Sequence, residues 1–221
     1  MPRLPARAGF AAAFLATAMS VTWAGTSVLA RLTDTVAVGA NTFTTAASFS
    51  SCGSPSTNTL TATADNYTFE DSPGENFGGT TDILVDSNGA RDKRTLVNFT
   101  LPTVPAGCSI TSSTLKFTTI SGTTARTLQA YRAATSWTET TSWWSNQPAT
   151  TGTAATATSS ATVDAVISWT VTAQVQAMYP SSMFGFVVKD SVENGAAQTQ
   201  TYHSRTSAST TKRPTLVVVI G

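Results

Sequence analysis

Aromatic side chains and an arginine recur in two short stretches of the second half of the chain. Trp143 precedes Trp144 in one stretch, and Tyr202, His203 and Arg205 stand close together in the other. Aromatic rings stack on the C–H faces of sugars, and a guanidinium beside them can hold a sugar carboxylate or hydroxyl. Trp143, Tyr202, His203 and Arg205 are therefore the candidate ligand-binding residues, and the partner they predict is a polysaccharide or cell-envelope glycan.

A catalytic role would make different demands on the same residues. Tyr202, His203 and Arg205 are residue types that a polysaccharide lyase uses to neutralise a uronate and move a proton. In an extended strand Tyr202 and His203 point to opposite faces, so they line one site only if a bulge intervenes. Arg205 can instead pair with a neighbouring acid, which is the interpretation we prefer. We therefore predict no catalytic residue and no enzyme, and a lyase is the last alternative.

Acidic residues concentrate between residues 65 and 92. They are Asp65, Glu70, Asp71, Glu75, Asp82, Asp86 and Asp92. Carboxylate oxygens can hold a structural calcium ion, but the spacing here is not that of an EF-hand loop. A solvated acidic face opposite the basic residues 91–94 is the interpretation we prefer, so no metal site is predicted. One His and two Cys are too few for the usual zinc sites, and no cofactor is expected.

Composition points to an all-β protein. The 221 residues include 43 Thr, 14 Gly and 9 Pro, which favour strands and turns over helices. The formal net charge is +1, and charged residues make up 11% of the chain. Such a chain offers no basic face that could displace the counterions of a nucleic acid, so a nucleic-acid partner is not expected.

Residues 65–221 alternate short strand-like runs with turn signals, as in a β-sandwich or barrel. In TLVNFTL, the apolar Val97, Phe99 and Leu101 share one face, which is the period of a half-buried strand. Further strands are expected in the runs STLKFTTI, RTLQAYRA, MFGFVVK and PTLVVVI. The last run fits a strand buried on both faces or packed inside the sandwich. Residues 148–160 have no core-forming side chain and predict an exposed or poorly ordered loop.

One short helix is expected in SWTVTAQVQAMYP. Val171, Val175 and Met178 are spaced i, i+4 and i+7, which places them on one face of a helix. Thr170 or Thr172 can cap its start, and Pro180 ends it.

The first 30 residues have the order of a bacterial export signal. Arg3 and Arg7 precede a long uncharged apolar stretch, and Val28 and Ala30 fit a cleavage site before Arg31. The stretch is also long enough to span a bilayer, so a retained anchor is the alternative. We expect a secreted or cell-surface protein, for which the membrane is a partner only through an uncleaved leader.

Residues 31–64 are rich in Thr and Ser and predict a leader or linker ahead of a domain at residues 65–221. Thiols oxidise outside the cytoplasm, and Cys52 and Cys108 are the only two cysteines in the chain. They predict one disulfide that ties the leader to the domain. Two free buried thiols are the alternative.

A spaced motif in the middle of the domain carries a family resemblance. It consists of Trp137, Thr138, Glu139, Trp144, Asn146 and Pro148. Together with runs such as DNYTFEDSPGENFGGTTDILV and TYHSRTSASTTKRPTLVVV, in this order, it makes residues 65–221 resemble the DNRLRE-type domain of bacterial secreted proteins. That family is grouped with carbohydrate-binding modules. The resemblance implies a jelly-roll-like antiparallel β-sandwich that binds polysaccharide without catalysis, with Trp144 in its core. Trp143 and His203 depart from the family pattern and could alter a binding surface.

Other features leave alternatives open. The stretch ARLTDTVAVGANTFTTAASF resembles the start of exported biofilm-fibre and camelysin-like proteins.

Trp137 and Trp169 lie in the motifs shared with the DNRLRE-type family and are expected to pack against other residues. Adjacent Trp143 and Trp144 point to opposite faces of an extended segment, so at most one is core. The alternative to carbohydrate binding is a structural cell-envelope or biofilm protein, or an adhesin without glycan specificity, which exposed edge strands would favour.

Overall fold

The computed structural model describes residues 52–179 and 183–221 and, for the backbone alone, residues 37–38 and 41–42. The chain divides into two units, Met1–Phe49 and Ser50–Gly221. In the first unit, strands β1 (Ala37–Val38) and β2 (Asn41–Thr42) form an antiparallel pair. The predicted export signal over residues 1–30 and its cleavage site lie outside the described residues.

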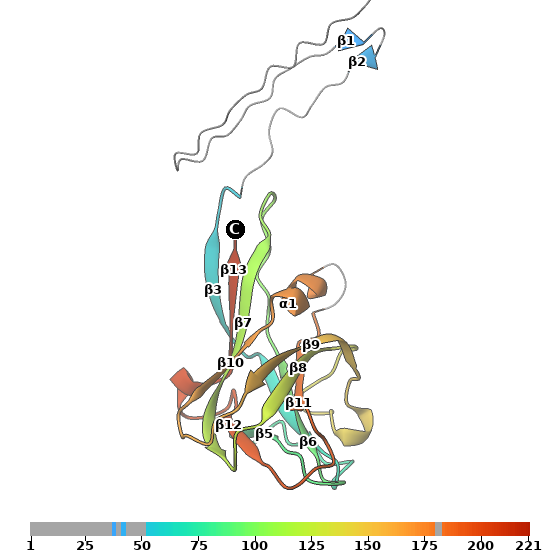
Figure 1. Cartoon of the computed structure of the whole chain (residues 1–221), viewed down its shortest axis with the longest axis vertical. Coiled ribbons are helices and arrows are strands. Elements are labelled where there is room, and N and C mark those ends of the chain that lie inside the picture. Colours follow the sequence, from blue (N-terminus) through green and yellow to red (C-terminus); the bar gives the residue numbers. More distant parts are fainter. Residues whose placement is uncertain (1–36, 39–40, 43–51, 180–182) are drawn as a thin grey trace, which may run out of the picture. The chain divides into compact units, whose positions relative to one another are not determined.

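The second unit is a sandwich of two antiparallel sheets (Figure 1). The six-stranded sheet has the order β3-β13-β7-β12-β5, and β10 pairs with the other side of β7. Its strands are β3 (Ser56–Thr61), β5 (Asp82–Val85), β7 (Ile110–Gly122), β10 (Val166–Thr170), β12 (Gln200–His203) and β13 (Thr215–Ile220). The five-stranded sheet has the order β4-β6-β11-β8-β9. Its strands are β4 (Ala64–Phe69), β6 (Lys93–Asn98), β8 (Thr127–Ala133), β9 (Thr150–Thr158) and β11 (Phe186–Asp190). The predicted all-β sandwich is confirmed.

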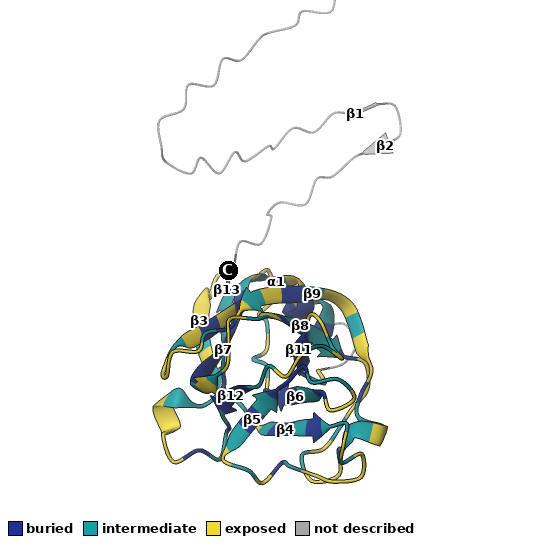
Figure 2. Ribbon diagram, turned by 60° about the horizontal axis from the view of Figure 1, so that its bottom comes forward, coloured by how far each residue is buried: buried dark blue, intermediate teal, exposed yellow. Residues whose placement is uncertain are grey.

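Alternate residues of both sheets fill the space between them, where Figure 2 shows the buried positions. Trp169 of β10 is fully buried, and its ring meets that of Phe117 edge-on at a centroid distance of 5.1 Å. Its indole Nε1 donates to the backbone oxygen of Leu128, in the facing sheet, at 3.2 Å. Trp169 therefore links the two sheets by packing and by a hydrogen bond, and its predicted packing role is confirmed.

Helix α1 (Thr172–Met178) lies where the apolar spacing predicts it. The three residues of its predicted apolar face, Val171, Val175 and Met178, are all buried. The predicted cap is wrong, because the N-cap residue is Val171 and makes no side-chain cap bond. Thr172 Oγ1 instead accepts a hydrogen bond from the backbone N–H of Ser113 at 3.0 Å. Pro180 lies outside the described residues. Within the part of the chain that the structure describes, no helix is long and apolar enough to cross a membrane.

The expectation of a loop over residues 148–160 is wrong, because this segment forms the edge strand β9. Ala155 and Ala157 pair with Ala130 and Leu128 of β8 and pack against the core. Thr156 between them is exposed on the outer face. Small inward side chains suffice at the margin of the core, where the backbone hydrogen bonds to β8 hold the strand.

Strand β3 belongs to the segment that the sequence assigns to a leader or linker, and it pairs with β13 along its whole length. Ahead of it, Cys52 is bonded to Cys108, with the two Cα atoms 4.3 Å apart. The predicted disulfide is confirmed. The six-stranded sheet thus begins before residue 65, and a strand and a disulfide both hold this segment on the sandwich.

Strand β13 lies between β3 and β7 in the six-stranded sheet (Figure 1). Leu216, Val218 and Ile220 are buried on its inner face, whereas Val217 and Val219 are half-exposed on the other. Packing inside the sandwich is therefore confirmed, and burial on both faces is wrong, because no further layer covers the outer face among the described residues.

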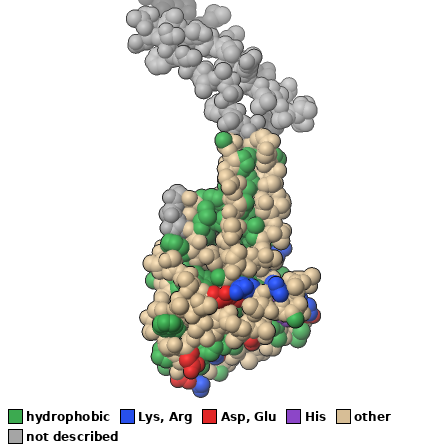
Figure 3. All heavy atoms as spheres, turned by 180° about the vertical axis from the view of Figure 1, so that it is seen from behind, with side chains coloured by type: hydrophobic (Ala, Val, Ile, Leu, Met, Phe, Trp, Pro, Cys, Tyr) green, Lys and Arg blue, Asp and Glu red, His purple; other side chains and the backbone are tan. Residues whose placement is uncertain are grey.

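The acidic stretch is not one solvated face. Asp65, Asp86 and Asp92 are each 1% exposed, and Asp86 pairs with Lys93 at 2.9 Å. The expectation of a solvated face is wrong for these three acids, because the strands bring them to basic partners or backbone amides. On the face drawn in Figure 3 most of the surface is uncharged, and acidic and basic side chains lie beside one another.

Candidate functional site

The outer face of the five-stranded sheet carries a row of polar side chains. Leu128, Ala130 and Val188 face the core, so the alternation of the strands turns their neighbours Gln129 and Lys189 outward. Lys189 lies opposite Gln129, and Gln129 lies opposite the exposed Thr156.

Arg94 of β6 continues this row on the other side of β11. Val188 pairs with Thr95, which places Lys189 beside Arg94. Neighbouring strands lie about 4.8 Å apart, so the row from Arg94 to Thr156 spans about 14 Å. Register alone thus brings together four polar side chains from four strands that are far apart in the sequence.

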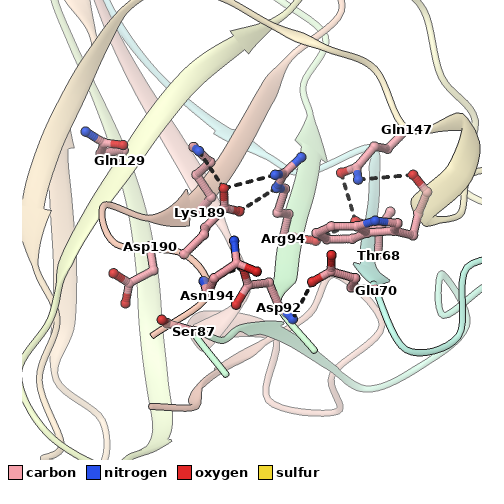
Figure 4. Close-up of polar contacts among 12 residues, drawn as sticks. Thr68, Glu70, Ser87, Asp92, Arg94, Gln129, Gln147, Lys189, Asp190 and Asn194 are labelled. Carbon is pink, nitrogen blue, oxygen red and sulfur yellow. Dashed lines mark hydrogen bonds and ion pairs between the residues drawn. The ribbon is translucent and has the colours of Figure 1, made fainter. Parts of the chain in front are cut away.

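An aromatic ring stands over one end of the row. The guanidinium of Arg94 lies 4.6 Å from the ring centroid of Trp144, a distance at which the cation is attracted to the ring face. Gln147 holds the segment that carries this ring, because it donates to the backbone oxygen of Trp144 at 3.1 Å and accepts from Thr68 at 3.0 Å (Figure 4).

The implied core position of Trp144 is wrong. Both Trp143 and Trp144 are half-buried, and a 3-10 turn over Trp144–Asn146 replaces the extended segment that the alternation argument assumed. Asn146 sets this turn, because its Oδ1 accepts from the backbone N–H of Trp143 and its Nδ2 donates to the backbone oxygen of Thr141, both at 2.8 Å.

A second aromatic group covers the apolar part of the same face. Leu96, Ala133 and Val187 form a small buried cluster against which Trp137 and Phe184 pack. The Trp137 indole donates to the backbone oxygen of Phe184 at 2.8 Å, so the predicted packing role of Trp137 is confirmed. Next to this cluster the half-buried Tyr131 donates to Gln129 Oε1 at 3.2 Å, which fixes the amide in the polar row.

Glu193, in the loop between β11 and β12, pairs with both cations of the row, Arg94 and Lys189, which are labelled in Figure 4. Its carboxylate accepts from Arg94 Nε at 2.6 Å and Nη2 at 2.9 Å, and from Lys189 Nζ at 2.7 Å. Burial alone would raise the pKa of Glu193, but the hydrogen bonds and charges of Arg94 and Lys189 lower it below its ordinary value. Glu193 is therefore ionised at neutral pH.

A model of carbohydrate-binding module family 96 matches residues 56–220. The chain belongs to this family. The match runs from β3 to β13 and indicates a non-catalytic carbohydrate-binding domain. No curated protein matches the chain. The DNRLRE-type label and the likeness of the N-terminal stretch to biofilm-fibre and camelysin-like proteins stay predictions.

The module does not bring the four predicted ligand residues onto one surface. Tyr202 is fully buried, with its ring centroid 5.5 Å from that of Phe117, so it is a core residue and cannot stack on a sugar at the surface. His203 points to the opposite side of β12, where Nδ1 lies 2.9 Å from Ser207 Oγ. Burial and the positive charge of Lys212 lower the pKa of His203.

Arg205 forms an ion pair inside the module, as the preferred interpretation predicts. Its guanidinium donates twice to Glu139 of the W-T-E motif. Its backbone N–H donates to Asp65 at 2.6 Å, and the backbone N–H of Asp65 donates to Glu139 at 3.2 Å. Burial raises the pKa of Asp65 to about 7, the hydrogen bond from Arg205 opposes this rise, and the charge of Glu139 adds to it.

One further hollow on the module carries less chemistry. A hollow of about 460 Å³ between β9 and α1 is lined mainly by Ala and Thr, with Arg132 as its one charged residue. Among residues 52–179 and 183–221, no three His, Cys, Asp or Glu side chains are grouped so that they could hold a metal ion.

The residues that sequence reasoning missed are Arg94, Lys189 and Gln129. Gln129 lies between the core-facing Leu128 and Ala130 of a predicted strand, which is a detectable signal. Arg94 precedes the predicted run TLVNFTL and Lys189 is followed by Asp190, so the alternation of apolar residues does not show which way these two side chains face. The sequence also does not show that the three strands are neighbours.

Proposed function

We propose that the module binds a polysaccharide chain on the outer face of its five-stranded sheet, outside a bacterial cell and without catalysis. The observation that carries this proposal is the row of Arg94, Lys189 and Gln129 beside the ring of Trp144. An aromatic ring next to several donors on one open face is the combination that sugar recognition uses. Membership of carbohydrate-binding module family 96 supports it.

The chemistry of the row favours a chain that carries carboxylates. Arg94 presents a planar fork suited to a carboxylate, and Lys189 adds a second positive charge beside it. Gln129 can bond sugar hydroxyls with its amide. We therefore expect acidic polysaccharides to bind more tightly than neutral ones of similar length.

Of the ligand-binding residues predicted from the sequence, only Trp143 remains a proposed contact. Trp143 is half-exposed next to Trp144 and stays a proposed contact at the rim of the site. His203 lies on β12 of the other sheet and Arg205 in the segment that follows β12, so neither belongs to the row on β6, β11 and β8. Export from the cell is supported by the predicted signal and by the disulfide, because such bonds persist in oxidising compartments.

Retention of the purified protein on immobilised polygalacturonate and on a neutral glucan, with product formation followed in the same samples, tests the proposal. Arg94→Gln and Lys189→Gln should each weaken retention on polygalacturonate about tenfold, the effect of one charge-assisted bond. Lys116→Gln, on β7 of the other sheet, is the matched control and should retain the parent affinity. Equal retention of all three variants, or new reducing ends, would contradict the proposal.

One observation favours the structural alternative. Edge strands β3 and β9 contain no charged residue and no proline, the features that usually protect a free edge from pairing with another chain. A building block of a cell envelope or biofilm should therefore self-associate, and Thr57→Lys on β3 should reduce this. Sedimentation velocity over a range of concentrations measures it, and a strictly monomeric protein that binds glycans would exclude this alternative.

A further inference from the structure

The carboxylate that occupies the polar row does not come from the sheet itself. Arg94 and Lys189 lie on neighbouring strands (Figure 4), and Glu193 reaches them from the loop that follows β11. The carboxylate of Glu193 accepts hydrogen bonds from Nε and Nη2 of Arg94. This is the edge of the guanidinium that forms two parallel hydrogen bonds with a carboxylate. A carboxylated sugar would need the same donors.

Other acids near the row are engaged elsewhere. Asp190 accepts two bonds from Arg126, both at 2.8 Å. Asp92 accepts from the backbone N–H groups of Asn88 and Asn194, at 2.9 and 2.8 Å. Glu193 is therefore the residue whose charge offsets Arg94 and Lys189.

The loop backbone is held while the side chain of Glu193 is not enclosed. The bond between Asn194 and Asp92 anchors the loop on one side of Glu193, and Ser87 Oγ donates to the backbone oxygen of Val192 on the other. The Glu193 side chain keeps 13% of its surface exposed, Lys189 22% and Arg94 26%. A rotation of the side chain can thus release both cations without any movement of the loop.

We propose that Glu193 is an internal competitor for the ligand: its carboxylate occupies the fork of Arg94 and Lys189 until a carboxylated polysaccharide replaces it. This inference rests on the proposed function of the same surface. A tethered group acts at an effective concentration of about a millimolar or more, so a single free uronate competes poorly. A polymer that presents many carboxylates gains enough avidity to displace Glu193, which selects for highly charged chains.

The test measures the affinity of the full protein for soluble polygalacturonate, for the same polymer with its carboxyl groups reduced, and for free galacturonate. Glu193→Gln should bind polygalacturonate about tenfold more tightly and gain measurable binding of galacturonate, since its amide no longer competes for the cations. Its affinity for the reduced polymer should not change.

Two further variants separate competition from general charge and from misfolding. Glu70→Gln makes the same change of net charge at a carboxylate that accepts from the backbone N–H of Asp92 and touches neither cation, so it should leave the affinity within about twofold of the parent. Glu193→Asp keeps the charge but shortens the reach, and it should also bind polygalacturonate more tightly. Thermal melts confirm that each variant is folded.

Tighter binding in both Glu193 variants, with no gain in Glu70→Gln, supports the inference. Unchanged or weaker binding in Glu193→Gln, while Arg94→Gln still loses retention, overturns the inference and leaves the proposed function standing. An equal gain in Glu193→Gln and Glu70→Gln also overturns it, because the effect is then one of long-range charge. If neither the parent protein nor Glu193→Gln binds any polymer, the proposed function falls with it.

Discussion

Substitution of the buried Asp65 should change how the stability of the sandwich depends on pH. Asp65 is 1% exposed, and its pKa is raised from 3.8 to about 7 by burial, against the hydrogen bond from the backbone of Arg205 and with the charge of Glu139. At about 1.4 kcal/mol per pH unit, this difference corresponds to about 4 kcal/mol. Stability falls as the pH rises, because between pH 3.8 and about 7 the folded state keeps a proton on Asp65 that the unfolded state has released.

The free energy of unfolding of the parent protein, measured by urea denaturation, should therefore fall as the pH rises from 5 to 8. Asp65→Asn should not show this fall, because the amide oxygen can still accept from Arg205 and carries no charge. What remains is a rise in stability up to about pH 6.5, because the pKa of His203 is lowered in the folded state. The lowered pKa of Glu193 acts in the direction opposite to Asp65, but only below about pH 4.5, where its stabilising contribution is lost as the pH falls. Asp71→Asn, at an exposed acid paired with Arg91, is the control and should keep the parent slope. The reasoning fails if the parent stability is flat over this range or if Asp65→Asn keeps the slope.

Two further predictions concern the stability of the core and of the leader. Trp169→Phe should lower the free energy of unfolding by about 3 kcal/mol, because it removes a buried ring edge and a hydrogen bond to the facing sheet. Trp144→Ala should lower it by about 1 kcal/mol or less and mainly weaken glycan retention. Urea denaturation compares the two variants, and equal losses would show that Trp144 is a core residue. Replacing the disulfide by Cys52→Ser with Cys108→Ser should cost about 4 kcal/mol in the chain-entropy model for a separation of 56 residues, and an unchanged melting temperature would contradict this.

Elements with a strong local pattern could be predicted from the sequence. Alternation of large apolar residues, Leu115 and Phe117, identifies β7, and apolar residues one helical turn apart identify α1. Strands β3 and β9 lack that signal, because their inward positions carry small or moderately apolar side chains. Their place in the sheets depends on hydrogen bonds to β13 and β8, which are contacts that local sequence does not reveal.

The candidate site was harder to predict than the fold, for two physical reasons. Trp144 leaves the core because Asn146 bends the chain into a 3-10 turn, which the assumption of an extended segment excludes. The polar row exists only once β6, β11 and β8 are known to be neighbours. For Tyr202 the sequence correctly predicts that it and His203 face opposite sides of β12. It does not show which of the two faces the core, and in the structure Tyr202 does.

The W-T-E and N-x-P pattern gains a physical meaning from the contacts of its residues. Glu139 fastens its segment to Arg205 and to the backbone of Asp65, while Trp137 bonds Phe184 and covers the apolar part of the sheet. Asn146 then turns the chain so that Trp144 stands over the remaining polar part. These residues hold a covering segment in place and identify the fold, whereas Trp144, which they position, belongs to the proposed binding surface. Specificity should instead follow the outward residues that the segment leaves open, which can vary without loss of the core.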